Sequence, residues 1–131
     1  MPKATAASAA ARQPLTRARV LDAATELVER DGPGALSMRG LGRALGVEGM
    51  AIYHHFKGRE DLTRALAVRL LEPLNDLAPS SDWRAASADF ATCLRAIAVT
   101  RPATFQLVGM HPLAEASLPP VERLLGCLVG A

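Results

Sequence analysis

The stretch SMRGLGRALGVEGMAIYHHF, from Ser37 to Phe56, decides the fold of this 131-residue chain. It has the parts that a helix-turn-helix requires. Ser37 can cap a first short helix, Ala44 is small enough for two helices to cross closely, and Gly46 tolerates the positive φ of a sharp turn. The apolar side chains of Val47 and Ile52 can fill the angle between the two helices. The second helix, expected from about residue 48 to residue 55, keeps one face for the major groove of DNA.

The sequence around this motif predicts further helices. Before it, Thr16 can cap a helix with one apolar stripe, which the run DGPG from Asp31 ends. After it, Glu60 and Asp61 place negative charge in the first turn of a fourth helix, which weakens at Pro73. Three more helix starts follow, at Asp82, at Pro102 and at the pair Pro119-Pro120.

The composition favours helices over strands. Half of the residues are apolar, mostly Ala, Leu and Val, and only five are aromatic. No run alternates apolar and polar residues as a half-buried strand does. We therefore expect an all-α fold with a disordered tail over residues 1–14, a three-helix domain with the helix-turn-helix over residues 15–60, and a second helical domain over residues 61–131. A basic arm that touches DNA is the alternative for the tail.

The charge is unevenly distributed along the chain. Residues 1–70 carry eleven Lys or Arg against seven Asp or Glu, whereas residues 71–131 carry four against six. This asymmetry favours a polyanionic partner, here double-stranded DNA, for the first part of the chain only.

Two observations favour a soluble protein of the reducing cytoplasm with no membrane partner. Cys93 and Cys127 lie in apolar helical patterns and are expected to be buried free thiols. No apolar run approaches the roughly 18 residues that span a bilayer, and the Ala-rich start lacks the Leu-rich core of a signal peptide.

The segment from residue 15 to residue 66 resembles the amino-terminal domain of TetR-family repressors. The opening of the second helix matches at Leu36, Ser37 and Arg39. The Leu-Gly-Val turn matches at residues 45–47, and the Tyr-x-His-Phe pattern matches at residues 53–56. The resemblance implies a sequence-specific transcriptional regulator, a ligand-responsive repressor that binds a palindromic operator as a homodimer.

The resemblance also implies which residues touch the DNA backbone. Tyr53, His55 and Lys57 match the phosphate-binding residues of the family, and Arg59 is a further phosphate candidate. Contacts of this kind fix the register of the protein on DNA without reading its sequence, and they make the affinity depend strongly on salt.

Base reading is expected from three residues. Arg39 can bind guanine, Met50 can contact a thymine methyl group, and His54 can donate to a purine acceptor. Ser37 and Gly49 complete the expected interface. Because Gly49 and Ala51 offer no side-chain hydrogen bond, we expect part of the specificity to come from DNA shape.

Several of these residues have other interpretations. Phe56 is expected to be a core aromatic residue, Tyr53 can be one too, and Arg39 can be a solvated charge. The pair His54-His55 is a poor metal site because neighbouring helical residues diverge by about 100°, whereas ligand pairs favour a spacing of four. Neither a metal nor a cofactor is expected.

Residues 61–131 resemble, more loosely, the start of the family's effector-binding and dimerisation domain, through Trp83, Arg95 and the pair Arg101-Pro102. Family members continue into the helices of their dimer interface, so we expect those helices to be missing from this chain. A pocket for an unknown small-molecule effector is expected among residues that can equally be core or surface residues: Trp83, Phe90, Phe105, Gln106 and His111.

Two functions of different classes therefore remain. The chain is a ligand-responsive repressor, or it is a helical ligand-binding or interaction protein that does not read an operator. An enzyme is not expected, because the cysteines lack an evident histidine partner and the sequence has no phosphate loop, paired-carboxylate site or metal-ligand spacing.

Overall fold

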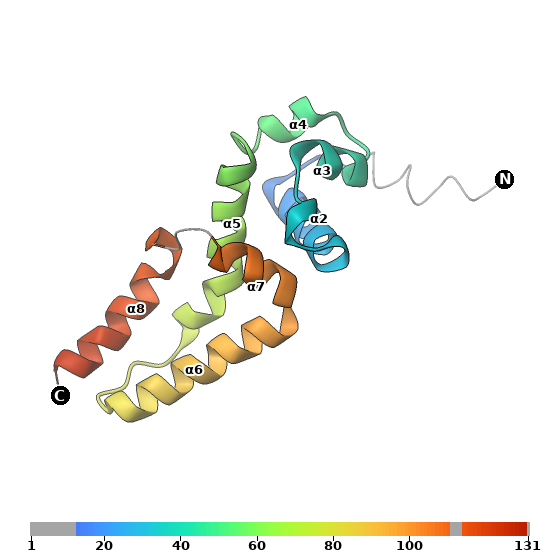
Figure 1. The fold of residues 1–131 in the computed structure, drawn as a ribbon. Coiled ribbons are helices and arrows are strands. Elements are labelled where there is room, and N and C mark those ends of the chain that lie inside the picture. Colours follow the sequence, from blue (N-terminus) through green and yellow to red (C-terminus); the bar gives the residue numbers. More distant parts are fainter. Residues whose placement is uncertain (1–12, 111–113, 131) are drawn as a thin grey trace. The chain divides into compact units, whose positions relative to one another are not determined.

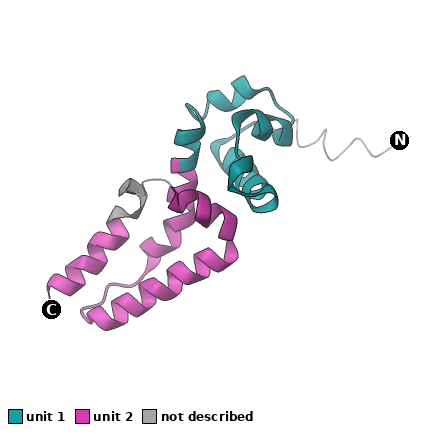
Figure 2. Ribbon diagram, viewed as in Figure 1, with its two compact units in different colours: residues 1–63 teal, residues 64–131 magenta. Residues whose placement is uncertain are grey.

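The computed structural model describes residues 13–110 and 114–130, with side chains from residue 119 onward in the second range. These residues form helices and turns without a strand, which confirms the predicted all-α fold (Figure 1). The chain divides into two compact units, residues 1–63 and residues 64–131 (Figure 2). Helix α5 (Arg59–Leu71) begins in the first unit and ends in the second.

In the first unit, α5 is preceded by α2 (Arg17–Asp31), α3 (Met38–Leu45) and α4 (Gly49–Tyr53), with the 3-10 turn η1 (Pro33–Ala35) after α2. The predicted caps of α2 are present. The hydroxyl of Thr16 accepts a hydrogen bond from the amide of Arg19 at 3.2 Å, and Gly32 ends the helix with a φ of 94°.

The core of the first unit combines the apolar stripe of α2 with inward-facing side chains from the helices that follow. Four of the five apolar positions predicted for α2 are buried, and Leu21 is partly buried. Because α4 has only five residues, packing holds it in place rather than its own helix propensity. The buried apolar side chains of this unit include Val20, Ala24, Leu27, Val28, Leu36, Leu41, Ile52, Phe56 and Leu62.

The second unit continues from α5 through the 3-10 turn η2 (Glu72–Asp76), α6 (Trp83–Thr100), α7 (Pro102–Gly109) and α8 (Ala114–Val129). As predicted, the carboxylate of Asp82 caps α6 by accepting from the amide of Arg84 at 2.9 Å. Helix α6 packs against both α7 and α8. The core cluster has Leu71, Leu74 and Ile97 at its centre, with partly buried neighbours that include Phe90, Cys93, Leu94 and Phe105.

Two predictions about the second unit were wrong. Pro119 and Pro120 lie inside α8 rather than at its start. The fixed φ of proline fits a helix, although each proline removes a backbone hydrogen bond and crowds the carbonyl four residues earlier. Cys93 and Cys127 are free thiols but only partly buried, because each lies at the edge of the packing rather than at its centre. The predicted tail lies outside the described residues up to residue 12.

Candidate DNA interface

Helices α3 and α4 cross closely at Gly42, which is buried. A Cβ atom at Gly42 would lie 2.9 Å from the backbone oxygen of Val47, closer than real side chains approach such an atom. The amide of Val47 also donates to the carbonyl of Gly42 at 2.9 Å. The prediction that Ala44 occupies the crossing was therefore wrong: Ala44 is exposed, because the two helices meet half a turn earlier on α3.

The turn between the two helices has the predicted chemistry. Ser37 caps α3, with its hydroxyl accepting from the amide of Gly40 at 2.9 Å. Gly46 ends α3 in the left-handed region, with a φ of 67°. A residue with a side chain is strained in this conformation, so glycine permits the sharp change of direction into α4.

Helix α4 presents one face to solvent and buries the other. Ile52 and Phe56 are buried on the inner side. On the outer side, Met50 is 68% exposed and Tyr53 is 47% exposed. Tyr53 is therefore a surface residue and not a core aromatic, whereas Phe56 is the core residue that was predicted. His54 and Lys57 are also exposed, and His55 is partly buried.

An open hollow lies between α3 and α4. It brings together three of the predicted interface residues, Arg39, Gly49 and Tyr53. It also contains Arg43 and Glu48, which the sequence analysis missed. The spacing of four between Arg39 and Arg43 places both on one face of α3 and is the signal that would have identified Arg43. The remaining lining residues are Met38, Gly42, Gly46 and Val47.

Two predicted interface residues have structural partners of their own. The Ser37 hydroxyl is the cap of α3, although it keeps a hydrogen to donate. The Nε of Arg59 donates to the carbonyl oxygen of Leu36 at 2.8 Å and so ties the start of α5 to the segment before α3. Part of the Arg59 guanidinium is thus used to hold the fold.

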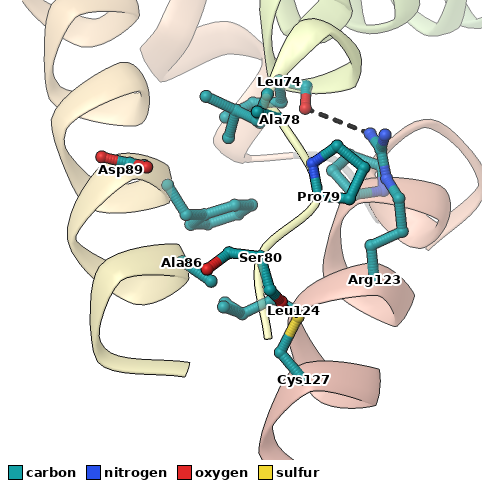
Figure 3. A pocket seen from close by; sticks show the side chains of 12 residues that line it. Leu74, Ala78, Pro79, Ser80, Ala86, Asp89, Arg123, Leu124 and Cys127 are labelled. Atoms are coloured by element: carbon teal, nitrogen blue, oxygen red, sulfur yellow. Dashed lines mark hydrogen bonds between the residues drawn. The ribbon is translucent and has the colours of Figure 1, made fainter. Parts of the chain in front are cut away.

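A small cavity of about 50 Å³ lies in the second unit, between α6, α8 and the segment after η2 (Figure 3). Arg123, Leu124 and Cys127 of α8 face Ala78, Pro79 and Ser80 across it. The Arg123 guanidinium donates to the carbonyl oxygens of Leu74 and Asn75, each at 3.1 Å, and the Cys127 thiol donates to the Ser80 carbonyl at 2.9 Å.

The predicted pocket residues are not gathered around this cavity. Phe90 lines it, whereas Trp83, Phe105 and Gln106 do not. Trp83 lies under the guanidinium of its neighbour Arg84, at 4.5 Å from the ring centroid, and Phe105 packs against the core cluster. His111 lies outside the described residues. Helical apolar spacing identified residues that pack, but it did not identify which of them border a space.

A short helix set across a second one, with an exposed face beside two arginines, defines a helix-turn-helix protein of the DNA-binding class. Residues 20–66 match the family model described as "Bacterial regulatory proteins, tetR family". The amino-terminal region that holds the helix-turn-helix is thus that of a TetR-family regulator, as its sequence had indicated.

Individual relatives agree with this assignment. The chain is 40% identical over 62 residues to the tetracycline repressor protein class D of Escherichia coli, which covers 47% of this chain and 28% of that protein. It is 29% identical over 114 residues to the HTH-type transcriptional repressor DrrR1 of Streptomyces coeruleorubidus, which covers 85% of this chain and 42% of that protein.

A solved structure is similar over most of the chain. A possible TetR family transcriptional regulator from Streptomyces coelicolor A3(2) superimposes with a TM-score of 0.75 and 27% identity, over 87% of this chain and 58% of that one. The chain thus spans less than half of the length of the curated relatives it matches. In the part of the chain that the structure describes, no helix is both long and apolar enough to span a membrane.

Proposed function

We propose that this chain acts in the cytoplasm as a DNA-binding, ligand-responsive transcriptional repressor. The observation that carries the proposal is the outer face of α4, where Met50 and Tyr53 are exposed and Tyr53 lines a hollow together with Arg39 and Arg43. Exposed apolar and aromatic side chains beside arginines suit a helix that meets both groove edges and phosphates. The relatives named as repressors support the same function.

The proposed division of roles follows the exposure of each residue. Tyr53, His55 and Lys57 contact phosphates at the end of α4 and just after it. Arg39, Met50 and His54 read bases, and Arg43 adds positive charge to the hollow beside them. Arg43 was not predicted, and it adds a second arginine to the hollow that contains Arg39.

The second unit supplies the response to a small molecule in this proposal. The cavity of about 50 Å³ is far smaller than the roughly 300–1,000 Å³ of typical ligand sites. An effector would therefore have to move α8 away from the segment after η2 in order to enter. Two copies would hold their recognition helices in register on a palindrome, as two-fold helix-turn-helix dimers do.

Selection from a randomised pool of duplexes about 30 base pairs long, followed by affinity measurements at several salt concentrations, tests the DNA-binding proposal. Lys57→Ala should lower the slope of log affinity against log salt by about 1, because one phosphate contact is lost. Arg39→Ala should relax the preference at one base position by about 1–3 kcal/mol. Arg95→Ala, on the exposed surface of the second unit, removes the same charge and should leave both quantities unchanged.

The alternative is a helical ligand-binding or interaction protein that does not read DNA. It predicts that no duplex is enriched, and that wild type and all three variants bind any duplex equally. If DNA shape contributes to specificity, exchanging the uncontacted central base pairs of the selected duplex should change the affinity, and a flat response would remove that part of the proposal.

A further inference from the structure

The end of the recognition helix needs an external support. Helix α4 stops at Tyr53, and the residues after it, His54 to Lys57, form an irregular turn. The amides of His55 and Phe56 both donate to the carbonyl of Ile52, at 2.9 and 3.0 Å. The turn carries His55 and Lys57, the proposed phosphate contacts. A turn after such a short helix has little rigidity of its own.

Arg17, the first residue of α2, reaches this turn from 38 residues earlier in the chain. Its Nη1 atom donates to the carbonyl oxygen of His55. Its guanidinium carbon lies 4.2 Å from the centroid of the Phe56 ring. The two contacts fall on adjacent residues, one on a carbonyl oxygen and the other over a ring. Phe56 is buried, so its ring is a fixed platform for the guanidinium.

The other side of the turn is held from α5. The amide of Lys57 donates to the carboxylate of Asp61 at 2.9 Å. The backbone between His55 and Lys57 is thus tied to α2 through Arg17 and to α5 through Asp61. A guanidinium suits the first tie because its planar fork can stack and donate at the same time, which an ammonium group cannot do.

We propose that Arg17 is a positioning residue that holds the turn from His54 to Lys57 in the geometry that binds phosphates. The proposal rests on the proposed DNA-binding function, because it gives Arg17 an effect on affinity through His55 and Lys57. The competing interpretation is that Arg17, which is exposed, contacts a phosphate itself.

The first experiment uses no DNA. Hydrogen exchange of the His55 and Phe56 amides reports how often the turn opens. Arg17→Ala should speed the exchange of both amides at least about fivefold relative to the wild type. Arg19→Ala is the matched control, because Arg19 lies on the same helix and donates to the carbonyl oxygens of Gln13 and Pro14 instead. Unchanged exchange in Arg17→Ala would overturn the proposal.

The second experiment measures affinity for the duplex selected from the randomised pool. Arg17→Ala should weaken binding about tenfold in the wild-type background and hardly at all in the His55→Ala/Lys57→Ala background, because residues that act together are not additive. Arg17→Lys should recover little of the loss. Additive losses, or full recovery by lysine, would show that Arg17 is an independent phosphate contact and would overturn the proposal while leaving DNA binding intact.

The two experiments separate the two proposals. If no duplex is selected by the wild type, the DNA-binding function fails and the role of Arg17 in phosphate binding fails with it. The exchange result then stands by itself as a statement about the turn.

Discussion

Replacing Gly42 with alanine gives the most direct test of how the helix-turn-helix is built. The added Cβ would lie 2.9 Å from the Val47 oxygen and 3.5 Å from the Gly49 nitrogen, both backbone atoms. A backbone atom cannot swing aside as the end of a side chain can. Helix α4 would have to shift by roughly half an ångström to restore an ordinary contact.

Two opposing terms decide the size of the effect. Alanine is favoured over glycine inside a helix by roughly 0.5–1 kcal/mol. Overpacking of a tight contact typically costs about 1–3 kcal/mol. Because the hydrogen bond from Val47 to Gly42 lies at the same crossing, the clash cannot be relieved without stretching that bond. We therefore expect Gly42→Ala to lower the free energy of unfolding by about 1–2 kcal/mol.

Urea unfolding followed by far-UV circular dichroism measures this change, and affinity for the selected duplex measures the displacement of α4. Ala44→Gln is the control, because Ala44 is exposed on the same helix and should change the stability by no more than about 0.5 kcal/mol. If Gly42→Ala is as stable as the wild type, or if Ala44→Gln is the more damaging change, the close crossing at Gly42 is refuted.

Three further predictions concern single interactions. Asp82→Ala should lower the free energy of unfolding by about 1 kcal/mol because it removes the cap of α6. Thermal unfolding of the second unit, followed by Trp83 fluorescence, measures this loss. Ser81→Ala is the control, and an equal loss in that variant would argue against a cap. Arg123→Met should lower the free energy of unfolding by about 1 kcal/mol, because it keeps the aliphatic stem but removes the donors to Leu74 and Asn75. Arg95→Met is the control. If the two variants are equally stable, the hydrogen bonds of Arg123 make no net contribution to stability. The hydrogen bond from Arg30 lowers the pKa of Asp31, so that pair stabilises the fold at neutral pH and stops doing so as the pH falls through the lowered value. Arg30→Ala should raise the pKa of Asp31 toward its ordinary value in an NMR titration, and an unmoved pKa would mean that the pair does not form in solution.

Much of the candidate site was predictable because its determinants are local. The hydroxyl of Ser37 and the left-handed Gly46 act on backbone within three or four residues of themselves. The alternation of exposed and buried positions on α4 follows from helix geometry, so Met50 and Tyr53 were predicted on the outer face. The resemblance to the TetR family was confirmed for the same reason, since its landmarks lie in consecutive short segments.

Other features of the site depend on contacts between segments far apart in the chain. The sequence near Arg17 does not indicate that its guanidinium lies over the ring of Phe56. The sequence near Arg59 likewise does not indicate that its side chain donates to the carbonyl of Leu36. The position of the cavity of about 50 Å³ could not be foreseen for the same reason, because aromatic residues at helical spacing fill space as readily as they border it. Of the predicted pocket residues that the structure describes, Phe90 alone lines this cavity.

The sequence alone therefore determined the caps of α2, α3 and α6, the turn at Gly46 and the exposed face of the recognition helix, because hydrogen bonds and periodicity within one turn specify them. Only the tertiary structure decided that Gly42, and not Ala44, is where α3 and α4 touch. Both residues are small, and the choice between them depends on the angle at which the two helices cross. Packing of α3 against α2 contributes to that angle, and α2 lies outside the segment from Ser37 to Phe56.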